Sequence, residues 1–234
     1  MGSSRLPGKV LLPAGGKTML EHLIQRLRRA KSVQEVVLAT TTHAQDDILV
    51  QSAQSLGIAS FRGSEQDVMA RVIGAARSVR GDVVVEITGD CPLIDPEIVE
   101  QAIRTFVANR SIYVSNSHVR SYPDGMDVQV YPLAALEKSS SMTTDPLDRE
   151  HVTLHMRNHP ELFPPLHLVA PPECHWPELG LTLDEPEDYQ LLKRVLEHFH
   201  PDHPQFSCLD VIRLLRAHPE WTQINRGVIR KGDA

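Results

Sequence analysis

Short β-branched runs alternate with helical patterns through the first half of the chain, and this alternation restricts the fold more than any other feature. Apolar strands are expected at 35–40, 58–61 and 82–87. Helices are expected over about 18–30 and 46–56, and from Ser64 and Asp95 onward. Strands that alternate with helices predict an α/β protein, in which a mostly parallel sheet lies between two layers of helices. The expected architecture is therefore a three-layer α/β/α fold.

The second half of the chain alternates less regularly. Strands are expected at 112–114, 126–130, 163–169 and 181–183, and helices at 147–158, 186–198 and 209–217. No internal repeat or linker-like stretch divides the chain, and its 234 residues suit one large α/β domain. The sequence predicts a single domain over 1–234, with an inserted or appended β element in its second half.

Composition excludes several classes of protein. The net charge is −6 and no run of Lys or Arg exceeds two residues, which argues against a nucleic-acid-binding protein. Apolar runs are far shorter than a membrane span, and the polar, glycine-rich start does not resemble a signal peptide. Cys91, Cys174 and Cys208 are widely spaced, as in proteins with reduced thiols. We expect a cytoplasmic protein that contacts neither nucleic acid nor membrane.

The opening segment, Gly2 to Lys9, combines small residues with two cations. Its backbone N–H groups, the Arg5 guanidinium and the Lys9 ammonium could bind a polyphosphate. A solvated basic terminus is the alternative. Ligands of parallel sheets bind at the carboxyl ends of the strands, where the loops at 40–42, 62–64 and 88–90 are expected to lie.

Two aspartates follow expected strands at this edge. Asp95 is accounted for as a helix cap before Pro96, whereas Asp90 is not needed for that role. Asp90 is equally consistent with a ligand of a hard cation such as Mg²⁺ and with a loop carboxylate. Asp184 has the same setting, between a short strand and a helix opened by proline. Together with the opening loop, the two aspartates would form a clamp for a metal-bound triphosphate.

The order and spacing of several motifs resemble those of the cytidylyltransferases, the group that contains CMP-sialic acid and CMP-Kdo synthetases. Within it, the chain most resembles the branch of spore coat polysaccharide biosynthesis protein F. The similarity covers nearly the whole chain. The motifs that carry it lie at 2–9, 16–22, 62–68, 88–96, 113–116, 123–128, 149–153, 183–189 and 219–225.

The resemblance implies a Rossmann-like nucleotidyltransferase fold of the GT-A-like kind, often dimeric through a β element around 112–170. It implies a Mg²⁺-dependent enzyme that transfers CMP from CTP to a sugar, a 2-keto sugar acid above all, with release of pyrophosphate for surface polysaccharide biosynthesis. It also implies residue roles by position. These are catalysis for Lys9, Arg5 and Asp90, nucleotide binding for Ser3, Ser4, Arg5, Lys9, Arg62 and Ser64, metal binding for Asp90 and Asp184, and sugar binding for Asn116, Asp127, Arg149 and His151.

The sequence departs from the family pattern in three places. The family normally opens with an apolar strand that ends in Gln-Ala-Arg, and here Met1 stands at the position that follows this Arg. Without that central strand we expect a divided sheet with exposed strand edges, and a catalytically impaired or non-catalytic binding protein becomes the alternative. Gly180 replaces a frequent Arg and Thr182 a frequent Asp. These changes favour a different sugar and leave no pair of aspartates on that strand.

Overall fold

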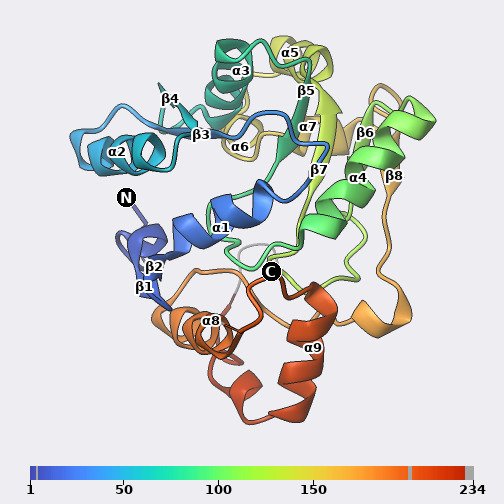
Figure 1. Cartoon of the computed structure of the whole chain (residues 1–234). Coiled ribbons are helices and arrows are strands. Elements are labelled where there is room, and N and C mark those ends of the chain that lie inside the picture. Colours follow the sequence, from blue (N-terminus) through green and yellow to red (C-terminus); the bar gives the residue numbers. More distant parts are fainter. Residues whose placement is uncertain (4, 200–201, 230–234) are drawn as a thin grey trace.

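The computed structural model describes residues 1–3, 5–199 and 202–229, so the predicted nucleotide contact Ser4 lies outside the described residues. Strands lie at the centre of the molecule with helices on both sides, and α8 and α9 lie together at one end (Figure 1). The predicted α/β architecture is confirmed.

The described strands are short. They are β1 (Pro13–Ala14), β2 (Lys17–Thr18), β3 (Val37–Thr41), β4 (Ala59–Gly63), β5 (Val83–Glu86), β6 (Tyr113–Ser115), β7 (Gln129–Pro132) and β8 (Pro165–His167). The α-helices are α1 (Met19–Leu27), α2 (Asp47–Ser55), α3 (Val68–Ser78), α4 (Pro96–Asn109), α5 (Leu133–Met142), α6 (Pro146–Glu150), α7 (Leu154–Asn158), α8 (Pro186–Phe199) and α9 (Cys208–Ala217). The 3-10 helices are η1 (Lys9–Leu11), η2 (Ala44–Asp46), η3 (Pro172–Cys174) and η4 (Trp221–Gln223).

The strands form a small β1–β2 hairpin and two larger groups. β3 and β4 pair in parallel, with Thr40 opposite Arg62. The other group has the order β5-β7-β6-β8, in which β7 is antiparallel to both neighbours while β6 and β8 are parallel. The remaining strands of this group therefore run in one direction, and the prediction of a mostly parallel sheet is confirmed.

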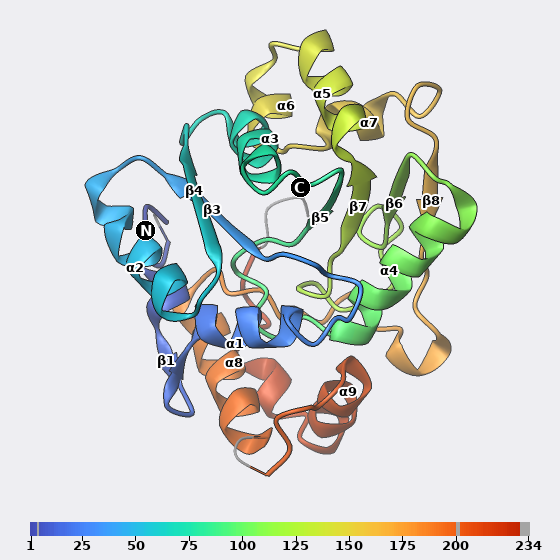
Figure 2. The ribbon, with the colours of Figure 1, turned by 45° about the horizontal axis from the view of Figure 1, so that its top comes forward.

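The β-structure is divided between β3 and β5, as expected from the sequence. Among the described strands, β3 pairs only with β4, and β5 pairs only with β7. The two groups are seen apart in Figure 2, with β3 and β4 on one side and the four-stranded group on the other. Val83 at the start of β5 keeps 45% of its surface exposed, in keeping with the position of β5 at the edge of its group.

The helices cover the strands in two layers and form a core with them. Leu20 and Ile24 of α1 and Leu49 of α2 pack with Leu38 and Ile58 against one face of β3 and β4. Helix α3 contacts the same two strands and also packs on α5 and α6, while α4 packs on β6 and β7. The largest apolar cluster joins α1, α4, α8 and α9. None of the described helices is long and apolar enough to cross a membrane.

Local signals account for where several helices begin. Thr18 accepts a hydrogen bond from the Glu21 N–H and Glu21 accepts one from the Thr18 N–H, which forms a capping box at the start of α1. Asp95 caps α4 through the Glu97 N–H, with Pro96 at the first helical position, as predicted. These caps fix the helices that flank the edge on which the candidate site lies.

Three elements of the second half differ from the sequence prediction. The helix expected over 147–158 is two short helices, because Val152 between them takes a positive φ of 48°. The strand expected at 181–183 is wrong, because the N–H groups of Leu181 and Leu183 donate to the separate loop carbonyls of Asp124 and Asp90. Helix α5 was not predicted from the sequence. Its serine-rich second half gives a weak helical pattern.

Candidate active site

The Lys9 side chain lies between two carboxylates that are far apart in the sequence. Its Nζ is 2.9 Å from Asp90 Oδ2 and 3.0 Å from Asp184 Oδ1. Arg5 completes the group, with Nη2 2.9 Å from Asp184 Oδ1 and Nη1 3.3 Å from Glu185 Oε1. The structure therefore brings together Arg5, Lys9, Asp90 and Asp184, four of the residues singled out in the sequence.

Two loops and one backbone hydrogen bond hold this cluster in place. Gly8 precedes η1 with a positive φ of 69°, a conformation that glycine adopts without strain, and the turn delivers Lys9 to the site. Asp90 stands in the loop after β5. The N–H of Leu183 donates to the Asp90 carbonyl at 2.8 Å. This contact fixes the loop after β5 against the segment that carries Asp184.

A buried pair that sequence reasoning missed positions Asp184. Asp188 is fully buried, and its Oδ2 accepts the N–H groups of Asp184 at 3.1 Å and Glu185 at 3.0 Å. Asn225 donates from its amide to Asp188 Oδ1 at 2.8 Å and to the Gly180 carbonyl at 3.0 Å. From the sequence alone, Asp188 is an acidic residue in the first turn of a helix, where its charge would compensate the helix dipole. The contact with Asn225 needs the fold, because 37 residues separate the two.

The electrostatics of the cluster keep Lys9 and Asp90 charged. Burial alone would lower the pKa of Lys9, but Asp90 and Asp184 outweigh it and raise that pKa above its ordinary value. Burial would likewise raise the pKa of Asp90, but Lys9 and a hydrogen bond from Thr88 lower it. Lys9 is therefore a full cation and Asp90 a full anion at neutral pH.

The donor set fits a magnesium ion that is shared with a ligand. Asp90 and Asp184 both place an oxygen within 3.0 Å of the same Nζ atom, so the two carboxylates can reach one cation. Within the described part of the chain, no group of three or more His, Cys, Asp or Glu side chains could hold a metal. Magnesium commonly uses one or two carboxylates together with waters and substrate phosphates. The residues therefore fit Mg²⁺ held jointly by protein and phosphate.

The charge of Asp90 acts on Asp127, and the side chain of Asn116 bonds to the backbone on both sides of Asp127. Burial first, and then the charges of Asp124 and Asp90, raise the pKa of Asp127 to about 7, against the opposing effect of Arg120. The amide of buried Asn116 donates to the Met126 carbonyl and accepts from the Val128 N–H, both at 2.7 Å. The Asn116 amide thus brackets Asp127. A sugar contact for either residue stays a prediction.

Arg62 and Ser64 lie at the carboxyl end of β4, as predicted, but their side chains bond locally. Arg62 donates to the carbonyls of Thr41 at 2.9 Å and His43 at 2.8 Å, and pairs with Asp47 at 2.6 Å. Ser64 Oγ accepts the Asp67 N–H at 3.0 Å. Both would have to exchange these partners to contact a nucleotide base.

The opening segment connects the carboxyl ends of β3 and β4 to the Lys9 cluster. The Met1 nitrogen is 2.9 Å from Asp46 Oδ1, beside the carboxyl ends of β3 and β4. Ser3 Oγ accepts the Leu6 N–H at 3.2 Å and so shapes the turn that leads to Lys9. Residues 1–3 and 5–9 thus run along the strand ends, the edge where ligands of α/β sheets bind.

The predicted sugar-binding residues Arg149 and His151 lie at and just after the end of α6. Arg149 donates to the carbonyls of Ser140 at 2.8 Å and Thr143 at 2.9 Å, and its Nη1 is 3.6 Å from Asp67 Oδ2. His151 is exposed. Arg149 therefore joins α5 and α6 to the loop before α3, and no described contact joins either residue to the Lys9 cluster.

Comparisons of the sequence with known proteins agree with this geometry. A family model described as Cytidylyltransferase matches residues 1–208. An uncharacterized protein of Methanocaldococcus jannaschii is 34% identical over 230 residues, which cover 98% of this chain and 93% of that protein. Spore coat polysaccharide biosynthesis protein SpsF of Bacillus subtilis is 34% identical over 225 residues, 94% of this chain and 92% of the relative.

Solved structures extend the comparison to the fold. The structure of a cytidylyltransferase from Leptospira borgpetersenii matches with a TM-score of 0.91 and 34% identity, over 98% of this chain and 95% of that one. CMP:2-keto-3-deoxy-manno-octonic acid synthetase complexed with CTP matches with a TM-score of 0.62 and 19% identity, over 84% of this chain and 95% of that one. The second likeness concerns the fold alone.

Proposed function

We propose, since the chain belongs to the cytidylyltransferase family, that it transfers CMP from CTP to a sugar, with release of pyrophosphate. The observation that carries the proposal is the direct contact of Lys9 with both Asp90 and Asp184. Such a cluster of cations and carboxylates suits the binding of a metal-bound triphosphate. Relatives named for spore coat polysaccharide and 3-deoxy-manno-octulosonate support a role in surface polysaccharide synthesis and a 2-keto sugar acid as acceptor.

In the proposed reaction, a sugar hydroxyl oxygen attacks the α-phosphorus of CTP. The new oxygen–phosphorus bond forms as the bond from the α-phosphorus to the bridging oxygen breaks. The electron pair of that broken bond leaves with pyrophosphate, and the proton of the sugar hydroxyl passes to water. Arg5 and Lys9 would turn from the carboxylates to the β- and γ-phosphates and neutralise the charge of the leaving group. Asp90 and Asp184 would hold Mg²⁺, which supplies further positive charge to the phosphate oxygens when it is bound.

The other predicted contacts complete the proposed substrate site. Ser3 and Arg62 would contact the nucleotide from the opening segment and from the end of β4. Asp127 would orient the sugar, because it lies near Asp90 and the Asn116 amide fixes its backbone neighbours. Arg149 and His151 would reach the sugar only if the loop before α3 and helix α6 line the same site.

Pyrophosphate release tests the proposal directly. The protein is incubated with CTP, Mg²⁺ and a panel of 2-keto sugar acids, and CTP binding is measured by calorimetry in parallel. We expect Lys9→Ala and Asp90→Asn each to lower the rate at least ~10²-fold, as for loss of a preorganised charge contact. Lys31→Ala and Asp82→Asn, at exposed positions, serve as controls. Absence of both pyrophosphate and CTP binding would overturn the proposed function.

A second candidate is a member of the family that binds the nucleotide without transferring it. The division of the β-structure between β3 and β5 favours this candidate, because it leaves unpaired strand edges beside the proposed site. The measurement of CTP binding and pyrophosphate release distinguishes the two candidates. Binding of CTP without pyrophosphate release from any sugar would support the non-catalytic protein.

We also propose a homodimer through the β element around 112–170. Val119, Leu166 and Val169 of this element are 43%, 37% and 56% exposed, and β8 pairs with β6 alone among the described strands. Exposed apolar side chains beside an edge strand are typical of an interface. Light scattering after size exclusion should give a dimer. Val169→Asp should give a monomer, whereas Val107→Asp on α4, at a position 67% exposed, should not.

A further inference from the structure

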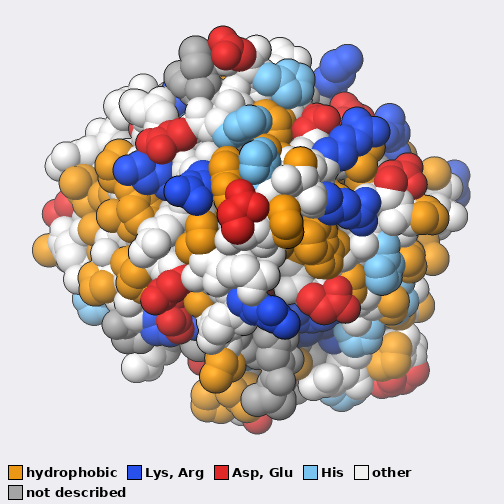
Figure 3. Space-filling model, turned by 90° about the horizontal axis from the view of Figure 1, so that it is seen from below, with side chains coloured by type: hydrophobic (Ala, Val, Ile, Leu, Met, Phe, Trp, Pro, Cys, Tyr) orange, Lys and Arg blue, Asp and Glu red, His pale blue; other side chains and the backbone are white. Residues whose placement is uncertain are grey.

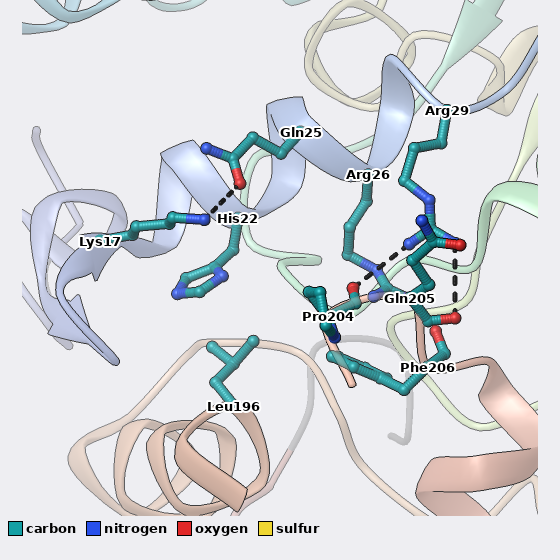
Figure 4. A pocket seen from close by; sticks show the side chains of 9 residues that line it. All are labelled: Lys17, His22, Gln25, Arg26, Arg29, Leu196, Pro204, Gln205 and Phe206. Atoms are coloured by element: carbon teal, nitrogen blue, oxygen red, sulfur yellow. Dashed lines mark hydrogen bonds between the residues drawn. The ribbon is translucent and has the colours of Figure 1, made fainter. Parts of the chain in front are cut away.

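A second cluster of basic side chains surrounds a pocket away from the Lys9 cluster. The pocket has a volume of about 260 Å³ and lies between α1, the end of α8 and the segment at 204–206. In Figure 4, Lys17, His22, Arg26 and Arg29 reach it from the side of α1, while Leu196 and Phe206 lie opposite. No residue of the proposed nucleotide site lines this pocket. Figure 3 shows the molecule from below the view of Figure 1, with basic side chains among its surface groups.

Among the described residues, every charged side chain that lines the pocket is basic. Lys17 donates to Gln25 Oε1 at 2.8 Å, and Arg29 donates to the carbonyls of Pro204 and Gln205 at 3.3 and 3.4 Å. Within the described residues, no salt bridge neutralises either cation or Arg26. On a chain of net charge −6, this leaves a concentration of positive charge in one hollow.

Arg26 lines the same pocket and is buried. Its side chain is 4% exposed, and its Nε and Nη2 donate to the carbonyls of Ile94 at 2.6 Å and Phe206 at 2.9 Å. Its Nη1 is buried without a hydrogen-bond partner among the described residues. The guanidinium stacks 4.1 Å from the Phe206 ring centroid. A buried donor without an acceptor is rare and costly, so its presence beside a basic pocket points to an absent anionic acceptor.

Arg26 stays positively charged although it is buried. Desolvation lowers the pKa of Arg26 to about 10, which still leaves it protonated at neutral pH. Asp95 is the carboxylate that acts on it. The two Asp95 oxygens accept the N–H groups of Glu97 at 2.9 Å and Cys208 at 2.6 Å. Asp95 is therefore committed to capping and does not fill the pocket.

We propose that this pocket binds a small molecule through a phosphate group. Arg26 Nη1, the Arg29 guanidinium with its long carbonyl contacts and the Lys17 ammonium provide several charged donors, which suit a dianion better than a single carboxylate. Leu196 and Phe206 add apolar surface for the remainder of the molecule, and the volume is that of a sugar-phosphate-sized ligand. The site is additional to the proposed CTP site and does not depend on that proposal.

Titration with inorganic phosphate at constant ionic strength, followed by calorimetry, tests the site. We expect binding by the unmodified protein and a loss of affinity of at least ~10-fold in Lys17→Gln/Arg29→Gln, because charge-assisted hydrogen bonds are removed. Both residues are more exposed than Arg26, whose replacement would disturb packing, so the double variant should fold. Arg77→Gln/Arg104→Gln, at two exposed positions, is the matched control for charge and should bind as before.

Further titrations distinguish binding at this pocket from binding at the nucleotide site. Lys9→Gln should leave phosphate binding intact if the ion occupies the pocket lined by Lys17, Arg26 and Arg29. A phosphate monoester of a sugar should bind at least as tightly as inorganic phosphate, and acetate should bind more weakly. The proposal is overturned if phosphate does not bind, if the Lys17 and Arg29 replacements leave its affinity unchanged, or if only Lys9→Gln reduces it.

Discussion

The ammonium of Lys9 lies 3.0 Å from Asp184 Oδ1, and the same ammonium contacts Asp90 at 2.9 Å. The cation thus takes the position between the two carboxylates that a metal ion would need. Two carboxylates that both lie within 3.0 Å of one ammonium group repel each other unless a positive charge lies between them. Without a ligand, Lys9 supplies that charge from within the chain.

Lys9→Gln should tighten the binding of Mn²⁺ in the absence of nucleotide. Removal of the ammonium leaves Asp90 and Asp184 without their shared cation, so a divalent ion no longer competes with it. We expect the Kd for Mn²⁺ to fall ~5- to 10-fold. Electron paramagnetic resonance of unbound Mn²⁺ measures this without any catalytic turnover.

Lys9→Arg is the control for this measurement, because it keeps a cation between the carboxylates. It should bind Mn²⁺ about as weakly as the unmodified protein. If Lys9→Gln also binds Mn²⁺ no more tightly, then the ammonium does not compete with a metal for Asp90 and Asp184, and those carboxylates have another role.

Asn225→Ala should weaken both the fold and the proposed reaction. The Asn225 amide is the donor to Asp188 Oδ1, and Asp188 in turn accepts the N–H of Asp184. Loss of this buried donor should lower the free energy of unfolding by about 1–3 kcal/mol. Because Asp184 loses its fixed position, the rate of pyrophosphate release should fall as well.

Asn109→Ala is the comparison for Asn225→Ala, since Asn109 is exposed and donates to the Thr105 carbonyl of its own helix. It should change neither property by a measurable amount. Chemical denaturation and the pyrophosphate assay are run on both variants. Equal effects at the two positions would show that the Asn225–Asp188 contact does not position the site.

The charged centre of the site could be predicted from the sequence because its parts lie at recognisable places. Lys9 is in a glycine-rich opening, and Asp90 follows a clear β-branched run, so both were expected at the carboxyl edge of the sheet. Their direct contact across 81 residues is a property of the fold. The prediction needed only the strand–helix alternation and the rule that parallel strand ends meet at one edge.

The supporting residues could not be predicted in the same way. Asp188 reads as an ordinary acidic residue in the first turn of a helix, and Asn225 lies near the end of the chain. The expected strand at 181–183 was wrong for a related reason, because Leu181 and Leu183 are buried but bond to two different loops. Burial alone does not distinguish a strand from an extended loop segment.

Gly125→Ala should be strongly destabilising. Gly125 has a φ of 98°, and an added Cβ would lie 2.6 Å from the Leu181 carbonyl oxygen. The backbone strain and the clash together should cost about 3 kcal/mol or more, because the loop that carries Asp127 must move. The midpoint of thermal or urea denaturation measures the effect.

Gly16→Ala separates the clash from the strain. Gly16 has a φ of 80°, but nothing lies within 4 Å of the position of an added Cβ. It should cost only about 1 kcal/mol, the penalty of the left-handed conformation. Losses of similar size at both positions would show that the contact of Gly125 with Leu181 is not a tight one.

Glu86→Gln should remove part of the pH dependence of stability. Burial, the largest cause, raises the pKa of Glu86 to about 7, against the opposing effects of Tyr131 and Arg157. The unfolded chain loses this proton near its ordinary pKa of 4.5, while the folded chain keeps it until about pH 7. The free energy of unfolding therefore falls as the pH rises through this interval, because the folded state binds more protons.

Urea denaturation of both proteins at about pH 5 and about pH 8 measures this contribution. The Tyr131 hydroxyl donates a hydrogen bond to Glu86 Oε2 at 2.5 Å, and the side-chain amide of the Glu86→Gln variant can still accept it but does not ionise. From the lower to the higher pH, the stability of the variant relative to the unmodified protein should rise by about 2 kcal/mol, at ~1.4 kcal/mol per pKa unit. Glu178→Gln, at an exposed position, should follow the unmodified protein. Parallel pH profiles for Glu86→Gln and the unmodified protein would contradict a protonated, buried Glu86.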